Sequence, residues 1–436
     1  MVNSFKWTNA SVLAFAEGED PIRAMEQKAR SLALTAMDEG WAGPPFDPLI
    51  LAERQNLRVI ARGDIADART VPADNGTLQL EFNPLRPRGR LRFSIAHEIA
   101  HTLFHDCADE VRCRGGHASD VPDNWQLEVL CNIGAAELLM PLGSFSQLAG
   151  EALSIQSVLE LRKRFDVSVE SCLIRLVKLA SQPGAAFCAS RHEDGLYHVD
   201  YIIPAPGWEC PIRVGQLVPT NSVILEANAI GFTAVGEEEW ITGQRMRVEG
   251  VGLAPYPGSL VPRVVGLLLS ADEDAYRAPT ITELDGDALY PRGQGPKIIV
   301  HVIPDSSTAW GGGGFAAQVR RRFPEVWKKY RLEAEAVGKS SRLGEVFFGS
   351  RADDVQFAHM VAQRGIGPSS GTRLSYAALA RTLTKVREKA TQLGASVHMP
   401  RIGTGHGGAD WVLVKELITQ ELVDRGVPVT VYKLPS

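Results

Sequence analysis

The chain has 436 residues, of which 44% are hydrophobic and 22% charged, and its formal net charge is −5. This is the composition of a globular protein of about two to four domains, and the slightly acidic balance excludes a strongly basic nucleic-acid binder. Residues 1–40 hold no basic segment followed by an apolar run, and no apolar stretch is long enough to span a membrane, so we expect a cytoplasmic protein. The 6 cysteines form no C-x-x-C pair, which favours free thiols.

The N-terminal part begins with helices and continues with short strands. Helical composition marks residues 20–39 and 48–54, whereas residues 57–60 and 78–82 alternate between apolar and polar side chains as strands do. We interpret residues 78–82 as an edge strand, because an exposed edge can hold an extended substrate by β-augmentation.

The motif H-E-x-x-H at residues 97–101 carries the clearest chemistry in the chain. Residues four apart share one face of a helix, so His97 and His101 can bind one zinc ion. Glu98 can reach a zinc-bound water as general base without being a ligand. The alternative is a chance match in which two half-buried histidines only satisfy each other, and a third ligand would distinguish the two interpretations.

That third ligand must lie downstream of the motif. Residues 126–140 predict a second helix that ends before Pro141. A separate zinc site built from Cys107, Cys113 and His117 is a further arrangement that the residue types allow. Spacing alone does not choose among the candidates for the third ligand, which are His105, Asp106, His117, Asp120, Asp123, Glu128 and Glu137.

The segments R-F-S-I-A-H-E-I-A-H-T-L-F-H and E-V-L-C-N-I-G-A-A-E-L-L-M-P together resemble the ImmA/IrrE family of metallopeptidases. The resemblance implies Zn²⁺ as cofactor and places the family's glutamate ligand on Glu128. Cys131 stands where the family usually has alanine, and Gly134 where it has phenylalanine; we interpret both as packing changes that leave the ligands untouched. Family members cleave protein partners, often transcriptional repressors, so the resemblance implies a regulatory protease.

Two further helices are predicted between residues 154 and 179. Residues 161–176 have the pattern of a helix-turn-helix with Ser168 as N-cap, which suggests DNA binding. Basic residues are few in this stretch, and we favour the interpretation that the pair packs as structure. Residues 1–181 are thus expected to form an α+β zinc peptidase domain with a C-terminal helix pair.

A β-rich middle domain is predicted over residues 182–272. Glycine, proline and β-branched residues become frequent here, and strand-like runs occupy residues 197–203, 244–249 and 263–269. Scaffold, substrate docking and relay are all open roles for this domain, and we interpret the acidic run at residues 237–239 as solvated surface.

Strands alternate with helices from residue 280 onward, which indicates an α/β/α sandwich. Two glycine loops, at residues 310–315 and 403–411, each join a strand to a helix. Glycines let backbone N–H groups approach an anion, and the helix N-terminus favours negative charge, so two such loops can clasp a diphosphate. A P-loop is excluded because no G-K-[ST] follows, and no acid lies at the place that a dinucleotide fingerprint requires.

The segments I-T-E-L-D-G-D-A-L, W-G-G-G-G-F-A-A-Q-V-R-R-R-F-P and M-P-R-I-G-T-G-H-G-G-A-D-W resemble a macro domain, in the branch of terminal ADP-ribose glycohydrolases and DarG-type antitoxins. The resemblance implies that residues 278–436 form a three-layer α/β/α domain that binds ADP-ribose. Asp287 then matches the acid that holds adenine. The two phosphate loops fall on Gly311, Gly312, Gly313, Gly314 and Phe315, and on Gly403, Thr404, Gly405, His406, Gly407 and Gly408.

Hydrolysis by this domain is the less favoured prediction. Where the branch carries a catalytic lysine, this chain has Gln363 and Arg364, and an arginine does not lose its proton to act as a nucleophile. Gly407 stands where the branch has a loop acid. We therefore expect binding of ADP-ribose without turnover.

The whole chain is predicted to be a zinc-dependent regulatory protease that cleaves a protein partner, such as a transcriptional repressor, under the control of ADP-ribose or of an ADP-ribosylated protein. One alternative is an ADP-ribosyl hydrolase that uses the peptidase domain to bind a partner. Another is a transcriptional sensor without proteolysis. Neither a membrane nor a nucleic-acid partner is favoured by the composition.

Overall fold

The computed structural model describes residues 6–73, 77–107, 123–141, 144, 153–180, 182–256, 260–270, 280–306, 313–337, 342–350, 355–366 and 371–433. The chain folds into two compact units. The first unit contains Met1–Ala29, Ala42–Met140 and Gly150–Ala278. The second unit contains Arg30–Trp41, Pro141–Ala149 and Pro279–Ser436. The predicted domain boundaries lie between residues 181 and 182 and between residues 272 and 278. Residues 181 and 271–279 are outside the described ranges, so both boundaries stay predictions.

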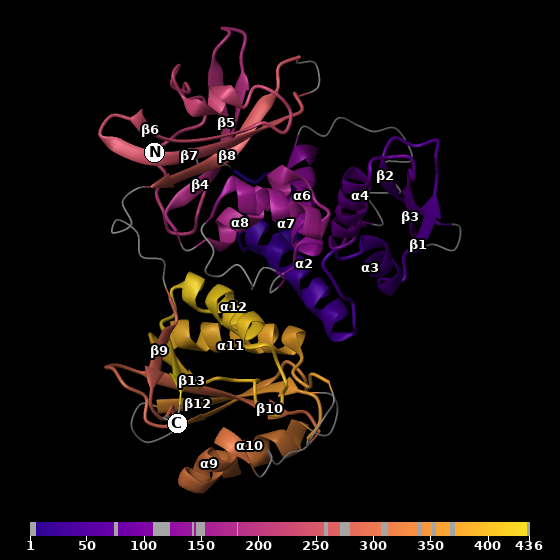
Figure 1. The fold of residues 1–436 in the computed structure, drawn as a ribbon. Coiled ribbons are helices and arrows are strands. Elements are labelled where there is room, and N and C mark those ends of the chain that lie inside the picture. The colour runs from indigo at the N-terminus through magenta and orange to yellow at the C-terminus, as the bar shows by residue number, and fades with distance from the viewer. Residues whose placement is uncertain are drawn as a thin grey trace. The chain divides into compact units, whose positions relative to one another are not determined.

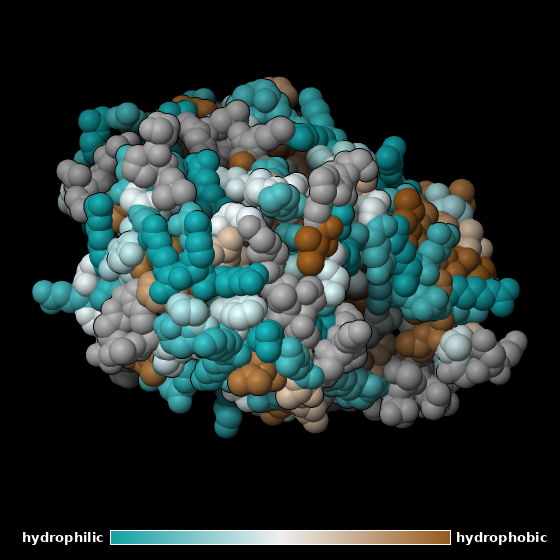
Figure 2. Space-filling model, turned by 90° about the horizontal axis from the view of Figure 1, so that it is seen from below, coloured by the Kyte–Doolittle hydropathy of each residue, from teal (hydrophilic) through white to brown (hydrophobic). Residues whose placement is uncertain are grey.

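Among the described helices, none combines the length and the apolarity that crossing a membrane requires. The face seen in Figure 2 is mostly hydrophilic, and its hydrophobic residues form several separate groups.

The N-terminal helices of the first unit are α1 (Ala10–Ala16), α2 (Pro21–Asp38) and α3 (Pro48–Arg54), which confirms the two predicted helices. Asp47 accepts a hydrogen bond from the Leu49 N–H and Pro48 occupies the first turn, so α3 begins where its sequence provides a cap.

A three-stranded sheet follows, with the strands in the order β1, β3, β2 (Figure 1). β3 (Leu78–Phe82) pairs in parallel with β1 (Arg58–Ala61) and antiparallel with β2 (Ala68–Pro72). The prediction that residues 78–82 form an edge strand is therefore wrong, because β3 lies at the centre. β2 was not predicted, since A-R-T-V-P has weak apolar alternation and ends in proline; β2 is one of the two edges.

The two helices that carry the candidate metal ligands are α4 (Arg88–His101) and α6 (Asn124–Leu139), and α6 ends just before Pro141 as predicted. They approach each other closely because small residues face across the contact. A Cβ on Gly134 would lie 2.8 Å from the Ala100 Cβ and 2.8 Å from the Met25 Sδ. Glycine at position 134 therefore sets the separation of the helices that hold the site.

The predicted helix pair consists of α7 (Ile155–Phe165) and α8 (Val169–Leu179), and Ser168 caps α8 by accepting the Ser171 N–H. Arg175 on α8 forms a buried ion pair with Glu137 on α6, with nitrogen–oxygen distances of 2.6 and 3.2 Å. All residues from 169 to 179 are described, and none of them is exposed. This burial is consistent with the prediction that the pair packs as structure, because a recognition helix presents an exposed face to the DNA groove.

An antiparallel sheet of five strands forms the rest of the first unit, in the order β5, β4, β8, β7, β6. Its predicted strands are β5 (Tyr197–Pro204), β7 (Gln244–Leu253) and β8 (Arg263–Ser270); β4 (Gly184–Arg191) and β6 (Thr233–Ile241) were not predicted. The short 3₁₀ helix η2 (Val223–Glu226) covers part of β6 and β7. Within the acidic run, Glu238 is structural, because it accepts the indole N–H of Trp240 at 2.7 Å.

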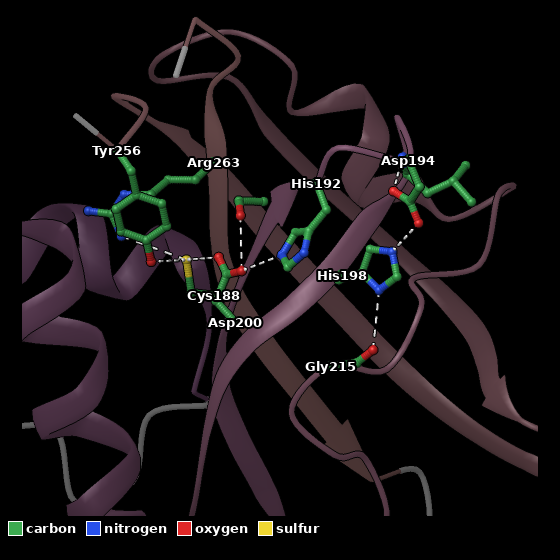
Figure 3. A network of polar contacts seen from close by, with 10 residues as sticks. Cys188, His192, Asp194, His198, Asp200, Gly215, Tyr256 and Arg263 are labelled. Carbon is green, nitrogen blue, oxygen red and sulfur yellow. Dashed lines mark hydrogen bonds and ion pairs between the residues drawn. The ribbon is translucent and has the colours of Figure 1, made fainter. Parts of the chain in front are cut away.

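A polar network crosses this sheet (Figure 3). Asp200 accepts hydrogen bonds from the Ser190 hydroxyl at 2.9 Å and from the imidazole of His192 at 3.1 Å, and the Cys188 sulfur lies 3.6 Å away. Burial raises the pKa of the Cys188 thiol to about 11, so it stays protonated near neutral pH. The histidine is bonded to the acid rather than to the sulfur. The described contacts therefore do not activate the Cys188 thiol as a nucleophile, and the network links side chains within the sheet.

The second unit has a sheet of six strands in the order β11, β12, β10, β13, β14, β9. In Figure 1, α11 and α12 lie on one face of this sheet and α9 and α10 on the other. Apolar side chains fill both interfaces. The strands are β9 (Thr282–Asp285), β10 (Lys297–Pro304), β11 (Val346–Ser350), β12 (Val355–Gln363), β13 (Ser396–Pro400) and β14 (Val429–Lys433); the helices are α9 (Gly314–Arg322), α10 (Pro324–Val337), α11 (Tyr376–Leu393), α12 (Trp411–Glu421) and the 3₁₀ turn η4 (Val423–Arg425).

Two buried histidines face each other within this sheet. His301 on β10 and His359 on β12 are register partners, and the His301 Nε2 lies 2.7 Å from the His359 Nδ1. Burial lowers the pKa of His301 to about 3 and holds the pKa of His359 well below its usual value. Both imidazoles are therefore neutral in the folded unit near pH 7.

We expect the second unit to lose stability as the pH falls. The unfolded chain takes up protons on these imidazoles from about pH 6.5 downward, whereas the folded unit does so only near the lowered pKa values. The free energy of unfolding therefore decreases as the pH decreases. The contribution of His301 to this loss is on the order of 2 kcal/mol between about pH 6.5 and pH 5. Hydrogen exchange of the β10 and β12 amides, corrected for intrinsic rates, measures this loss.

The matched variant is His301→Gln, which keeps a hydrogen-bonding side chain but does not titrate. Its exchange protection is expected to change less steeply with pH than that of the wild type. An equally steep dependence in His301→Gln would contradict the assignment of the effect to this histidine.

Candidate metal centre and nucleotide pocket

The side chains of His97, His101 and Glu128 converge in the first unit. The His97 Nε2 lies 3.1 Å from the His101 Nε2 and 3.1 Å from a carboxylate oxygen of Glu128, and the His101 Nε2 lies 3.7 Å from the other oxygen. The histidines are one helical turn apart on α4, and Glu128 comes from α6. Separations of about 3–4 Å between donor atoms are those of ligands around one tetrahedral ion.

The orientation of His97 is set by a second residue of α6. The His97 Nδ1 donates to the side-chain oxygen of Asn132 at 3.0 Å, which leaves the Nε2 directed at the cluster. Asn132 lies four residues after Glu128, so both project from one face of α6. A hydrogen bond to the outer nitrogen is the usual way in which a metal-binding imidazole is held in place.

Glu98 lies beside the cluster and is oriented by the small sheet. The Thr70 hydroxyl on β2 donates to its carboxylate at 2.8 Å. Burial raises the pKa of Glu98 above its usual value, and the Thr70 hydrogen bond offsets part of that rise. A carboxylate with a raised pKa is a better proton acceptor for a neighbouring water than an exposed one.

Most of the other candidates for the third ligand are engaged elsewhere or lie outside the described residues, and Asp106 is not among the donor atoms that converge with the histidines. Glu137 is held by Arg175. His105 is exposed and lies 3.7 Å from Glu17, and Asp123 accepts the hydroxyl of Thr8. Cys113, His117 and Asp120 fall outside the described residues, as does the separate zinc site that would include the first two.

One residue of the cluster was missed by the sequence reasoning. The ligand atoms of His97, His101 and Cys131 all lie within 4.8 Å of one another, and the Cys131 side chain is fully buried. The interpretation of Cys131 as a packing residue stays a prediction, because its side chain lies in an apolar cluster while its sulfur also lies near the two imidazoles. The available signal was its position three residues after Glu128, which places it on the same helix face.

The glycine loops of the second unit border a cavity of about 580 Å³. Its volume is in the range of small-molecule sites in proteins. The predicted residues that line it are Asp287, Gly313, Gly314, Phe315, Gly403, Thr404, Gly405, His406 and Gly407. Gly408 does not line the cavity, and Gly311 and Gly312 lie outside the described residues.

The second loop can only be built from glycine at two of its positions. Gly403 has a φ of +76°, a conformation that other residues avoid, and a Cβ on Gly407 would lie 2.4 Å from the Gly403 carbonyl oxygen. Gly405 differs, since a Cβ there would meet nothing within 4 Å. The cavity wall at residue 405 is therefore open to substitution without a clash in the loop.

Asp287 also lines the cavity and is already bonded. One carboxylate oxygen accepts the Leu289 N–H at 3.0 Å, and the other lies 2.9 Å from an Arg322 nitrogen. These contacts fix the carboxylate as a hydrogen-bond acceptor in the wall.

Several lining residues were not predicted, among them His301, Gln318, Ile366 and Arg401. They come from one strand, one helix and two loops, so no local pattern links them. Of the two residues at the position of the missing lysine, Gln363 lines the cavity, and Arg364 is not among the lining residues.

Comparison with known proteins gives two separate similarities. Residues 52–177 match the Peptidase M78 model, described as the IrrE N-terminal-like domain. Radiation response metalloprotease IrrE of Deinococcus deserti is 38% identical over 125 residues, which are 25% of this chain and 40% of that protein. Chromodomain-helicase-DNA-binding protein 1-like of Mus musculus is 32% identical over 178 residues, which are 38% of this chain and 19% of that protein. The chain thus spans less than half of either curated relative.

Among solved structures, a macrodomain protein from Streptomyces coelicolor is 37% identical, and the match covers 36% of this chain and 99% of that chain with a TM-score of 0.31. Residues 52–177 of this chain are thus similar to the IrrE N-terminal-like domain, and about 36% of the chain is similar in sequence to the macrodomain protein.

Proposed function

We propose that this protein is a zinc-dependent protease that cleaves a protein partner and is controlled by ADP-ribose or an ADP-ribosylated protein. The observation that carries the proposal is the convergence of His97, His101 and Glu128 on one point, with the carboxylate of Glu98 beside it. The similarity to a metalloprotease over residues of the same segment supports it.

His97, His101 and Glu128 would hold the zinc, with Asn132 fixing the ring of His97. When bound, zinc acts as a Lewis acid and lowers the pKa of a water. Glu98 would accept a proton from the attacking water and would pass it to the leaving amine. Thr70 keeps the carboxylate of Glu98 aimed at the site throughout.

The position of Thr70 also suggests how a substrate is held. Thr70 belongs to the edge strand β2, and its hydroxyl donates a hydrogen bond to the carboxylate of Glu98. An extended peptide that adds to the open edge of β2 would run past Glu98. In this proposal β2 takes the role that the sequence suggested for residues 78–82.

The cavity of the second unit is the proposed ADP-ribose site, within a three-layer macro domain. Its two glycine-containing walls suit a diphosphate, and Asp287 suits the exocyclic amine of adenine because it is held as an acceptor. Gln363 lines the cavity where hydrolysis would need a base or nucleophile. A neutral amide supplies neither, so the proposed role is binding without turnover.

The link between the two sites is tested by following cleavage in the presence and absence of ADP-ribose. Zinc-loaded full-length protein is incubated with a peptide library prepared from a bacterial proteome, and new termini are identified by mass spectrometry. We expect ADP-ribose to change the cleavage rate of the wild type and to leave Gly405→Glu unaffected. Equal rates with and without ADP-ribose in the wild type would overturn the control, while leaving the peptidase role standing.

A further inference from the structure

We propose that Cys131 is a fourth ligand of the metal centre, so that the centre is closed by sulfur before substrate arrives. This inference rests on the metal centre proposed above and adds a residue to it. It assigns a function to the thiol at a position where the sequence suggested only packing.

The geometry places the sulfur among the donors. Its distance to the ligand nitrogens of His97 and His101 is within 4.8 Å. Sulfur and nitrogen ligands of one tetrahedral zinc lie about 3.5 Å apart, so a shift of about 1.3 Å or less would bring the sulfur and the two imidazole nitrogens onto one ion. The thiol lies three residues after Glu128 on α6, and both side chains therefore reach the site from the same face.

The surroundings of the sulfur favour this role. The side chain of Cys131 is fully buried between α4 and α6, in the same apolar cluster as Ala100 and Leu127. A buried sulfur donor beside two imidazoles forms a set that selects zinc over magnesium or calcium, because thiolate is a soft ligand. The Glu128 side chain is 39% exposed, so it is the more accessible of the two α6 donors.

The chemical consequence follows from the number of donors. Three protein ligands leave one position for water, as in catalytic zinc sites, whereas four fill the tetrahedron, as in structural sites. With Cys131 bound, water reaches the zinc only when one protein donor leaves it. Removal of the thiol should therefore weaken metal binding and raise the basal rate of cleavage.

Cobalt substitution of the full-length protein tests the assignment directly. Co²⁺ bound to a thiolate gives a sulfur-to-metal charge-transfer band in the near ultraviolet, separate from the visible bands that report tetrahedral binding. We expect this band in the wild type and in Cys172→Ala, whose cysteine is equally buried but lies on α8. We expect Cys131→Ala to keep the visible bands, to lose the charge-transfer band, and to bind zinc about tenfold or more weakly.

Zinc-edge X-ray absorption of the wild type provides a readout that needs no variant, and one sulfur neighbour is expected. Visible cobalt bands without a sulfur band, or a sulfur band that survives in Cys131→Ala, would overturn the role of Cys131 and leave the histidine and glutamate centre intact. Failure of the wild type to bind cobalt or zinc at all would overturn both the inference and the proposed peptidase.

Discussion

Substitution of Glu98 by glutamine is expected to lower cleavage by about 10²- to 10⁴-fold while zinc stays bound. The amide has nearly the same shape as the carboxylate but cannot accept the proton of a water. It can still accept the hydrogen bond of the Thr70 hydroxyl, which is 2.8 Å from the carboxylate in the wild type. Because Glu98 is not among the convergent donor atoms, the zinc content should be unchanged.

The measurement compares two quantities on the same preparations: zinc per chain by atomic absorption, and cleavage of the proteome-derived peptide library by mass spectrometry. Glu53→Gln is the matched control, since it makes the same chemical change at an exposed position of α3. Cleavage by Glu98→Gln at the rate of Glu53→Gln would exclude Glu98 as the general base. Loss of zinc would assign it to the ligand set instead.

Gly405→Glu is expected to weaken ADP-ribose binding by about a hundredfold or more. Residue 405 lines the cavity, and a Cβ there meets nothing within 4 Å, so the loop can accept the substitution. The new carboxylate then occupies the wall that is proposed to face the diphosphate. Repulsion between like charges in such a site costs about 3 kcal/mol, which corresponds to the expected loss.

Calorimetric titration of full-length protein with ADP-ribose measures this effect. Gln392→Glu on α11 adds the same charge at an exposed position that does not line the cavity, and it should bind as the wild type does. Binding by Gly405→Glu with unchanged affinity would move the diphosphate out of this cavity. Absence of binding by the wild type would remove ADP-ribose from the proposed function.

Local patterns in the sequence were enough to predict the elements that carry the site. The i, i+4 spacing of His97 and His101 requires only one helix, and the glycine loops require only a strand, a turn and a helix in succession. For the same reason α3 and β3 were predicted with the bounds that the structure has, because turn residues or prolines border each of them.

Tertiary structure decided everything that depends on which elements lie side by side. β3 is the central strand of its sheet because the unpredicted β2 pairs with its second edge. β2, the strand of Thr70, is therefore an edge strand in place of β3. The Cys131 sulfur lies near the two imidazoles because Gly134 lets α4 and α6 approach closely. His301 reaches the cavity from a strand and Arg401 from a loop. Hydrophobic periodicity records which face of an element is buried, but it does not record the partner against which that face packs, and these contacts depend on the partner.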